Sequence, residues 1–231
     1  MEIGAVKTAA GKDKTPVINE LAPRWPFRMI VVGSSGSGKT NMVLDLIQRY
    51  IPWQVLLVYA RHMGPAYEAL RRKVESREKR LRRPISFWAD TLEDAIPVDE
   101  LSPENRNLVI FDDFVLDRKR QDVIADYFVR GRHKNCSCIY ISQSYYDVPK
   151  IIRTNCSHVA IFKGYNGHDL VGLWKDHGAG MTRVEFGRYL REATQRSFGF
   201  AFIDNNPARE ELRWRLGFDT LVLPDDDDNA K

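Results

Sequence analysis

Short apolar runs alternate with amphipathic segments along most of the chain. The runs are rich in Val, Ile and Leu and stop at glycine or polar residues, as buried parallel strands do, whereas apolar residues three or four positions apart predict helices between them. The predicted strands cover 28–32, 55–59, 85–89, 108–111, 138–142, 158–162 and 197–203, and the predicted helices cover 40–50, 66–83, 121–129, 170–174 and 182–193. This alternation predicts an α/β protein with a mainly parallel central sheet flanked by helices.

The chain length favours one core domain with appendages, because 231 residues, 43% of them hydrophobic, can bury one real core. Residues 1–26 mix Gly, Lys and Thr with three prolines, which predicts an extended arm. The core is expected over 27–204. Residues 205–231 are expected to form a small C-terminal extension, and the acidic run at 225–228 predicts a disordered tail rather than a metal site.

Charge is distributed unevenly, although the net charge is only +4. Residues 71–83 carry eight basic and two acidic side chains, and further basic positions lie at 118–120 and at Lys134. Such clusters suit contact with nucleic-acid phosphates, but a solvated helix face is the commoner reason for each of them. The sequence therefore names no DNA-contact residue.

The chain shows no membrane or export signal. No stretch approaches the roughly 20 apolar residues that span a bilayer, and the N-terminal segment lacks the apolar core of a signal peptide. We expect a soluble, intracellular protein that is not secreted and has no membrane partner.

The strongest motif is Gly33–Thr40, with the sequence GSSGSGKT, between a predicted strand and a predicted helix. It fits the P-loop pattern completely and lies in the context that this motif requires. Its backbone N–H groups and its lysine would bind the phosphates of ATP, and its threonine would offer a hydroxyl to Mg²⁺. The predicted nucleotide-binding residues are Gly33, Ser34, Ser35, Gly36, Ser37, Gly38, Lys39 and Thr40.

An acidic pair, Asp112 and Asp113, follows the apolar run 108–111. We expect Asp112 to act with Thr40 in holding Mg²⁺, through the water shell of the ion. Asp113 is expected to orient the attacking water and accept its proton. A lone acidic pair would more often belong to a turn or a helix cap, but the complete P-loop upstream reverses that preference.

Gln143 follows the predicted strand 138–142 and should emerge at the carboxyl edge of the sheet, where its amide could bond the γ phosphate or the water. Arg130 and Arg132 precede the same strand, so they should lie at the opposite edge. From there a neighbouring subunit's nucleotide is within reach, and the alternative for each is a surface arginine that pairs with an acidic side chain or with solvent. An arginine supplied in trans is worth about 10³ to 10⁵ in rate.

Five segments in this order carry a family likeness: Gly33–Thr40, the strand that ends in Asp112 and Asp113, Gly131–Asn135 (GRHKN), Ile141–Tyr146 (ISQSYY) and Ile152–Asn155 (IRTN). Together they resemble the poxvirus-type genome-packaging ATPases of large DNA viruses, virophages and polinton-like elements, within the FtsK/HerA superfamily. The likeness spans about 27–163, and its later segments are more specific than the P-loop.

This resemblance implies a RecA-like P-loop NTPase fold in which the Gln143 strand lies between the P-loop strand and the Asp112 strand. It implies a ring of identical subunits, often drawn as a hexamer, that uses ATP to drive double-stranded DNA into a capsid. By this resemblance, Arg132 is the best candidate for the arginine finger and Arg153 is the second, and Gln143 would act as the sensor. Many superfamily members carry Glu where this chain has Asp113, so a shorter side chain must reach the water.

The same resemblance implies action inside the host cell, in a viral factory or the nucleus, with the virion as a further location and a capsid vertex protein as a further partner.

Three other interpretations stay open. A small P-loop nucleotide kinase would need a lid and an acceptor pocket, and a nucleotide-dependent switch could dispense with Asp113. A HerA-like DNA pump or helicase would use the same site chemistry.

Overall fold

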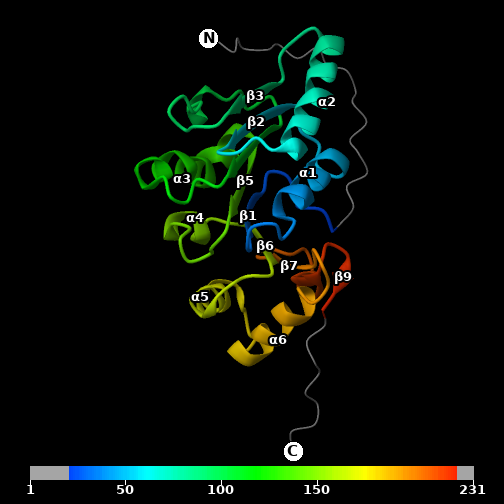
Figure 1. Ribbon diagram of the computed structural model, residues 1–231, viewed down its shortest axis with the longest axis vertical. Helices are drawn as coiled ribbons and strands as arrows, with labels where there is room; N and C mark the ends of the chain where they lie inside the picture. The colour runs from blue at the N-terminus through cyan, green and yellow to red at the C-terminus, as the bar shows by residue number, and fades with distance from the viewer. Residues whose placement is uncertain (1–20, 223–231) are drawn as a thin grey trace, which may run out of the picture.

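The computed structural model describes residues 21–222, and these form a mixed sheet with helices on both faces (Figure 1). Its strand order is β3-β2-β4-β5-β1-β6-β7-β8-β9. The strands are β1 (Arg28–Val32), β2 (Val55–Ala60), β3 (Ser86–Ala89), β4 (Asn107–Asp112), β5 (Cys136–Ser142), β6 (His158–Phe162), β7 (Phe200–Asp204), β8 (Trp214–Leu216) and β9 (Thr220–Leu221). The expected α/β class and the RecA-like placement of β5 between β1 and β4 are both confirmed.

The first six strands in this order pair in parallel, whereas β7, β8 and β9 are antiparallel. In the register of β1 with β5, Val32 pairs with Ser142, and in that of β4 with β5, Asp112 pairs with Ile141. The three strands therefore end side by side. The residues that follow them, from Gly33, Asp113 and Gln143 onward, begin at one edge of the sheet.

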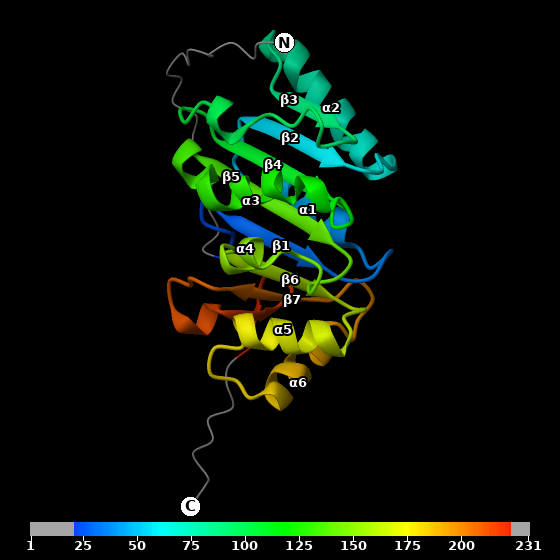
Figure 2. The ribbon, with the colours of Figure 1, turned by 90° about the vertical axis from the view of Figure 1, so that its left-hand side faces the viewer.

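Two apolar cores lie on opposite faces of the sheet (Figure 2). One face is covered by α1 (Lys39–Arg49) and α2 (Pro65–Leu81), whose buried residues pack on β1, β2, β4 and β5. The other face is covered by α3 (Gln121–Arg130), α4 (Lys150–Thr154), α5 (Gly167–His177) and α6 (Arg183–Ala193). Side chains of the central strands are consequently buried on both faces, which explains why β1, β4 and β5 are near-continuous apolar runs.

Short elements complete the described chain and were not predicted from the sequence. They are α4, β8, β9 and the 3-10 helices Arg118–Arg120, Gly131–Lys134 and Glu210–Leu212, whereas the 3-10 helix Val98–Glu100 lies in the stretch 90–107, for which the sequence predicts a short helix and loop. Strands of two or three residues are too short to show a period of two, so no pattern marks them. Because β8 and β9 extend the sheet beyond β7, residues 214–221 belong to the same sheet as the core.

The last predicted strand begins later than the sequence suggested, at Phe200 rather than at residue 197. Phe198 has φ 62, which no strand residue adopts, and it turns the chain before β7 starts. At the other end, residues 21–26 lie against the domain, where Trp25 Nε1 donates to Asn135 Oδ1 at 2.7 Å. The rest of the predicted arm and the acidic run at 225–228 lie outside the described residues.

Candidate nucleotide site

The loop between β1 and α1 is braced against the end of β6. The Ser34 N–H donates to the Lys163 carbonyl at 2.9 Å, and the Ser34 hydroxyl donates to the same oxygen at 3.1 Å. Glycine is required on both sides of this contact. A Cβ at Gly33 would lie 2.5 Å from the Phe162 Cβ, and one at Gly164 would lie 2.5 Å from the Ser34 Cβ. The loop can lie this close to residues 162–164 only because neither Gly33 nor Gly164 has a Cβ.

Lys39 is buried inside the curled loop, and its ammonium group donates to the carbonyls of Gly33 at 2.6 Å and Ser34 at 2.8 Å. Burial lowers the pKa of Lys39, and the nearby charges of Asp112 and Asp113 oppose that shift. A buried ammonium held at the first turn of α1 offers its charge to phosphate oxygens in the loop.

Thr40, Asp112 and Tyr67 form a hydrogen-bonded group beside Lys39. Asp112 Oδ2 accepts from the Thr40 hydroxyl at 3.0 Å and from the Tyr67 hydroxyl at 2.7 Å. Burial raises the pKa of Asp112, and these two hydrogen bonds act in the opposite direction. Burial, followed by the charge of Asp112, raises the pKa of Tyr67 well above its usual value, so its hydroxyl stays a donor.

This group fits Mg²⁺ by its donor chemistry, because it offers a hydroxyl and a carboxylate, which are hard oxygen ligands. Residues 21–222 contain no group of three or more His, Cys, Asp or Glu side chains that could hold a metal. Mg²⁺ characteristically binds through one or two protein oxygens together with waters and substrate phosphates.

Asp113 and Gln143 meet at the same edge, where Gln143 Nε2 donates to Asp113 Oδ1 at 3.4 Å. Asp113 has φ 64, and its N–H donates to the Ile141 carbonyl at 3.1 Å, so the chain turns sharply as β4 ends. Asp adopts this left-handed conformation more readily than Glu. The short acidic side chain therefore has a backbone reason at this position.

All of these elements border one cavity of about 350 Å³, within the range of about 300–1,000 Å³ typical of small-molecule sites. Ser37 Oγ is buried at this cavity and has no hydrogen-bond partner among the described residues. Its hydroxyl could therefore donate to a bound anion. The curled loop, the buried lysine and this hydroxyl fit a nucleotide's phosphates. The lining residues are Ser35–Asn41, His62, Gly64, Pro65, Ala66, Tyr67, Asp112, Asp113, Ile141, Ser142, Gln143 and Phe198.

The two predicted finger arginines lie away from this cavity. Arg132 is exposed in the 3-10 helix Gly131–Lys134, which precedes β5, and Gln143 follows the other end of that strand. Arg153 has partners in its own chain, because it donates to Asp176 Oδ2 at 2.5 Å and to the Val148 carbonyl at 3.0 Å. Arg130 pairs with Asp126 and Asp99. Arg130 and Arg132 are both exposed, and Arg130 is the one that has acidic partners.

Two further lining residues, Tyr67 and Phe198, were not assigned to the site from the sequence. Tyr67 fits the apolar face of the basic helix, and Phe198 fits an aromatic strand. Tyr67 directly follows Pro65 and Ala66 at the start of α2. No local pattern shows that this helix begins beside the Asp112 carboxylate.

Comparison with known proteins identifies the family of this chain. The family model described as Poxvirus A32 protein matches residues 18–170, which is more than half of the chain. The chain belongs to the poxvirus A32 protein family. Its curated relatives include the DNA packaging protein OPG160 of variola virus and of vaccinia virus, each 27% identical over 145 residues, covering 60% of this chain and 54% of the relative. The chain thus spans about half the length of these A32 family relatives.

Solved structures similar to this A32 family member include the genome packaging NTPase B204. The B204 of Sulfolobus turreted icosahedral virus 2 in complex with AMP has a TM-score of 0.54 and 14% identity, covering 78% of this chain and 93% of that one. B204 from Sulfolobus Turreted Icosahedral Virus, described as a DNA-packaging ATPase, has a TM-score of 0.56 and 12% identity, covering 80% and 95%. At this identity the likeness establishes a shared P-loop NTPase fold.

Gly164→Ala should displace the phosphate loop, because its Cβ would lie 2.5 Å from the Ser34 Cβ and its φ of 105 disfavours any side chain. We expect the free energy of unfolding to fall by roughly 1–3 kcal/mol, and calorimetric titration should show weaker ADP binding. Gly180→Ala is the matched control, because Gly180 has φ 95 with nothing within 4 Å. It should cost stability but leave ADP affinity unchanged. Wild-type ADP affinity in Gly164→Ala would contradict the bracing.

Proposed function

We propose that this chain hydrolyses ATP with Mg²⁺ and uses the energy to move double-stranded DNA during packaging of a viral genome. The observation that carries the proposal is the single cavity in which the phosphate loop, Asp112, Asp113 and Gln143 meet. Membership of the A32 family supports the biological setting, because relatives in that family are named DNA packaging proteins.

Phosphate binding is assigned to residues 33–40. The loop's backbone and Lys39 hold the β and γ phosphates, and Thr40 and Asp112 hold the metal. Bound Mg²⁺ would neutralise charge on the phosphate oxygens. The hydrogen bond from Thr40 to Asp112, at 3.0 Å, already brings these two oxygen ligands together.

Water activation is assigned to Asp113. Its carboxylate orients the water and accepts its proton, while Gln143, 3.4 Å away, positions the same water or contacts the γ phosphate. Gln143 is exposed at the sheet edge, so it can also respond to the loss of the γ phosphate.

The basic residues that line the cavity favour an assembled ring. Lys39 is the single Lys or Arg among its described lining residues, so no arginine of residues 21–222 lines the site proposed for the γ phosphate. A small nucleotide kinase would supply such arginines from its own lid. We assign Arg132 as the residue delivered to a neighbour's site, with Arg153 as the second candidate, in a ring that could be a hexamer.

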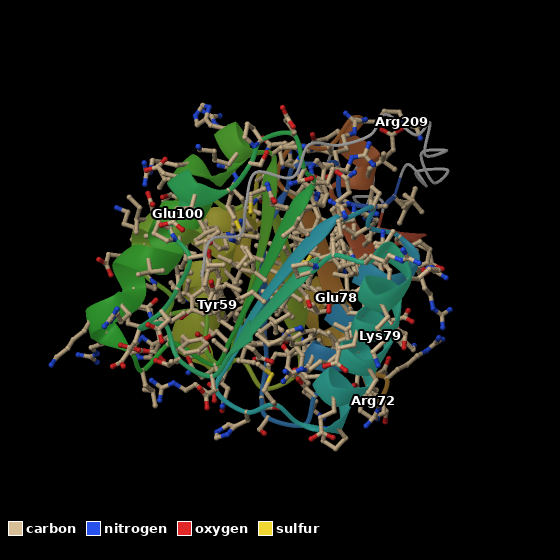
Figure 3. All side chains as sticks on the ribbon, turned by 90° about the horizontal axis from the view of Figure 1, so that it is seen from above. Tyr59, Arg72, Glu78, Lys79, Glu100 and Arg209 are labelled. Atoms are coloured by element: carbon tan, nitrogen blue, oxygen red, sulfur yellow. The ribbon has the colours of Figure 1, made fainter. Side chains whose placement is uncertain are left out.

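DNA contact is assigned to exposed basic surface. Arg72 and Lys79 are exposed on α2 (Figure 3), whose first residues, Pro65–Tyr67, line the cavity. Three other basic residues of α2 have partners, since Arg71 pairs with Glu75, Arg77 lies over the Trp53 ring and Lys73 donates to Gln48 Oε1. Contacts to DNA phosphates would be independent of sequence, as a motor requires.

The proposed setting is the interior of the infected host cell, in a viral factory or the nucleus, and the virion. Viral packaging also implies a capsid vertex protein as a partner. Within residues 21–222, no helix has the length and apolar character needed to cross a membrane.

Asp113→Asn should retain ATP binding but hydrolyse ATP roughly 10² to 10⁴ times more slowly, because it removes the proton acceptor. Asn tolerates the left-handed backbone at φ 64, so the change alters charge with little strain. Phosphate release and nucleotide titration measure the two effects. Asp45→Asn, on the exposed side of α1, is the control and should turn over normally. Normal turnover by Asp113→Asn would remove Asp113 from the base role.

Mixing Arg132→Ala subunits with Asp113→Asn subunits should restore part of the ATPase activity that each lacks alone. The reason is that an Asp113→Asn subunit can still donate its Arg132 to a neighbour with an intact Asp113. Mixing Arg153→Ala with Asp113→Asn provides the comparison for the second candidate. Absence of recovery at every mixing ratio would count against Arg132 acting across an interface.

The ATPase rate, measured with and without long double-stranded DNA over a range of protein concentrations and at two salt levels, tests the proposed motor. We expect steep dependence on protein concentration, because sites would be completed by assembly, and stimulation by DNA that weakens as salt rises. Flat turnover that ignores DNA would favour a self-contained kinase or a nucleotide switch instead.

A further inference from the structure

The loop between α6 and β7 lies beside the phosphate loop. β7 lies beside β6 (Figure 2) and is antiparallel to it, so its first residue, Phe200, pairs with Phe162 at the carboxyl end of β6. Phe198 therefore precedes β7 at the edge where β1 and β6 end. Its ring borders the phosphate loop, with Cδ1 3.0 Å from the position that a Cβ on Gly38 would take.

Phe198 has two features that cost free energy. Its ring is 70% exposed, although burial would stabilise it, and its backbone has φ 62, which is rare for a bulky residue. The Gly199 N–H donates to the Arg196 carbonyl at 2.9 Å, which closes a turn whose third position, Phe198, would favour Gly or Asn. Neither cost is offset by burial of the ring in the core.

The turn is fixed by its surroundings. A Cβ at Gly199 would lie 2.5 Å from the Ala193 carbonyl, so the chain after Phe198 is packed closely against the end of α6. Phe200 then stacks on Phe162, with ring centroids 5.0 Å apart. The backbone at Phe198 is thus fixed at the rim of the cavity, and strained residues of this kind cluster at ligand sites.

We propose that Phe198 is the stacking platform for the purine base of the bound nucleotide. The proposal rests on the nucleotide site of the proposed function and extends that site beyond the phosphates. Tyr67, another aromatic lining residue, is buried and donates its hydroxyl to Asp112, whereas Phe198 offers an exposed aromatic surface at the rim. A base that stacks on this ring covers its exposed face and gains the attraction between aromatic planes.

Calorimetric titration with two probes, ADP and inorganic pyrophosphate, both with Mg²⁺, separates the base from the phosphates. Phe198→Ala should weaken ADP binding by about 5- to 150-fold and leave pyrophosphate binding unchanged, because pyrophosphate has no base to stack. Phe198→Tyr should bind ADP like the wild type. Val184→Ala, at an exposed apolar position on α6, is the control and should change neither affinity.

Two further variants distinguish binding from folding. Phe198→Gly relieves the left-handed backbone, so it should unfold at equal or higher denaturant concentration than the wild type while losing ADP affinity as Phe198→Ala does. In Phe198→Trp, indole fluorescence should change with ADP but not with pyrophosphate.

Equal ADP affinity in the wild type, Phe198→Ala and Phe198→Gly would overturn the stacking proposal and leave the phosphate site intact. Altered self-association with unchanged ADP affinity would assign Phe198 to a subunit interface instead. A wild-type protein that binds neither ADP nor pyrophosphate would overturn the proposed function together with the stacking proposal. Parallel losses for both probes would show that Phe198 shapes the phosphate loop and does not stack on the base.

Discussion

The parallel pairing of β1, β5 and β4 is the constraint on which the candidate site depends. Their registers bring Val32, Ser142 and Asp112 to one edge, so the three following loops converge although they are far apart in sequence. Each strand is buried on both faces, and a shift by one residue would move every side chain into the opposite core, where it would have to pack against different neighbours. The positions of the phosphate loop, Asp113 and Gln143 are therefore stabilised by the whole sheet.

Tight backbone conformations gather around the cavity, and each has a local chemical reason. Gly33 and Gly164 allow the phosphate loop to touch the end of β6, where a Cβ on either would overlap a neighbouring side chain. Asp113 and Phe198 adopt left-handed φ values of 64 and 62 without being glycine. Such conformations cost roughly 1–3 kcal/mol each and persist where the surrounding structure fixes them. Their concentration at one edge agrees with a ligand site there.

The parts of the candidate site that can be predicted from the sequence are those formed by residues adjacent in the chain. GSSGSGKT between a strand and a helix, and an acidic pair after an apolar run, are patterns of adjacent residues, so residues 33–40, Asp112 and Asp113 could be predicted. Tyr67 and Phe198 could not, because their places depend on where α2 and the turn before β7 pack in three dimensions. β8 and β9 could not be predicted for a different reason, since strands of two or three residues show no periodicity.

Movement along DNA is the central claim, and displacement of a third strand from a DNA triplex measures it most directly. The protein is incubated with ATP, Mg²⁺ and a duplex that carries a bound triplex-forming oligonucleotide, and release of that oligonucleotide is followed over time. We expect release that requires ATP and is absent in Lys39→Ala, whose phosphate contact is lost. Rapid ATP hydrolysis without any release of the oligonucleotide would contradict the account, because energy would be spent without movement along the duplex.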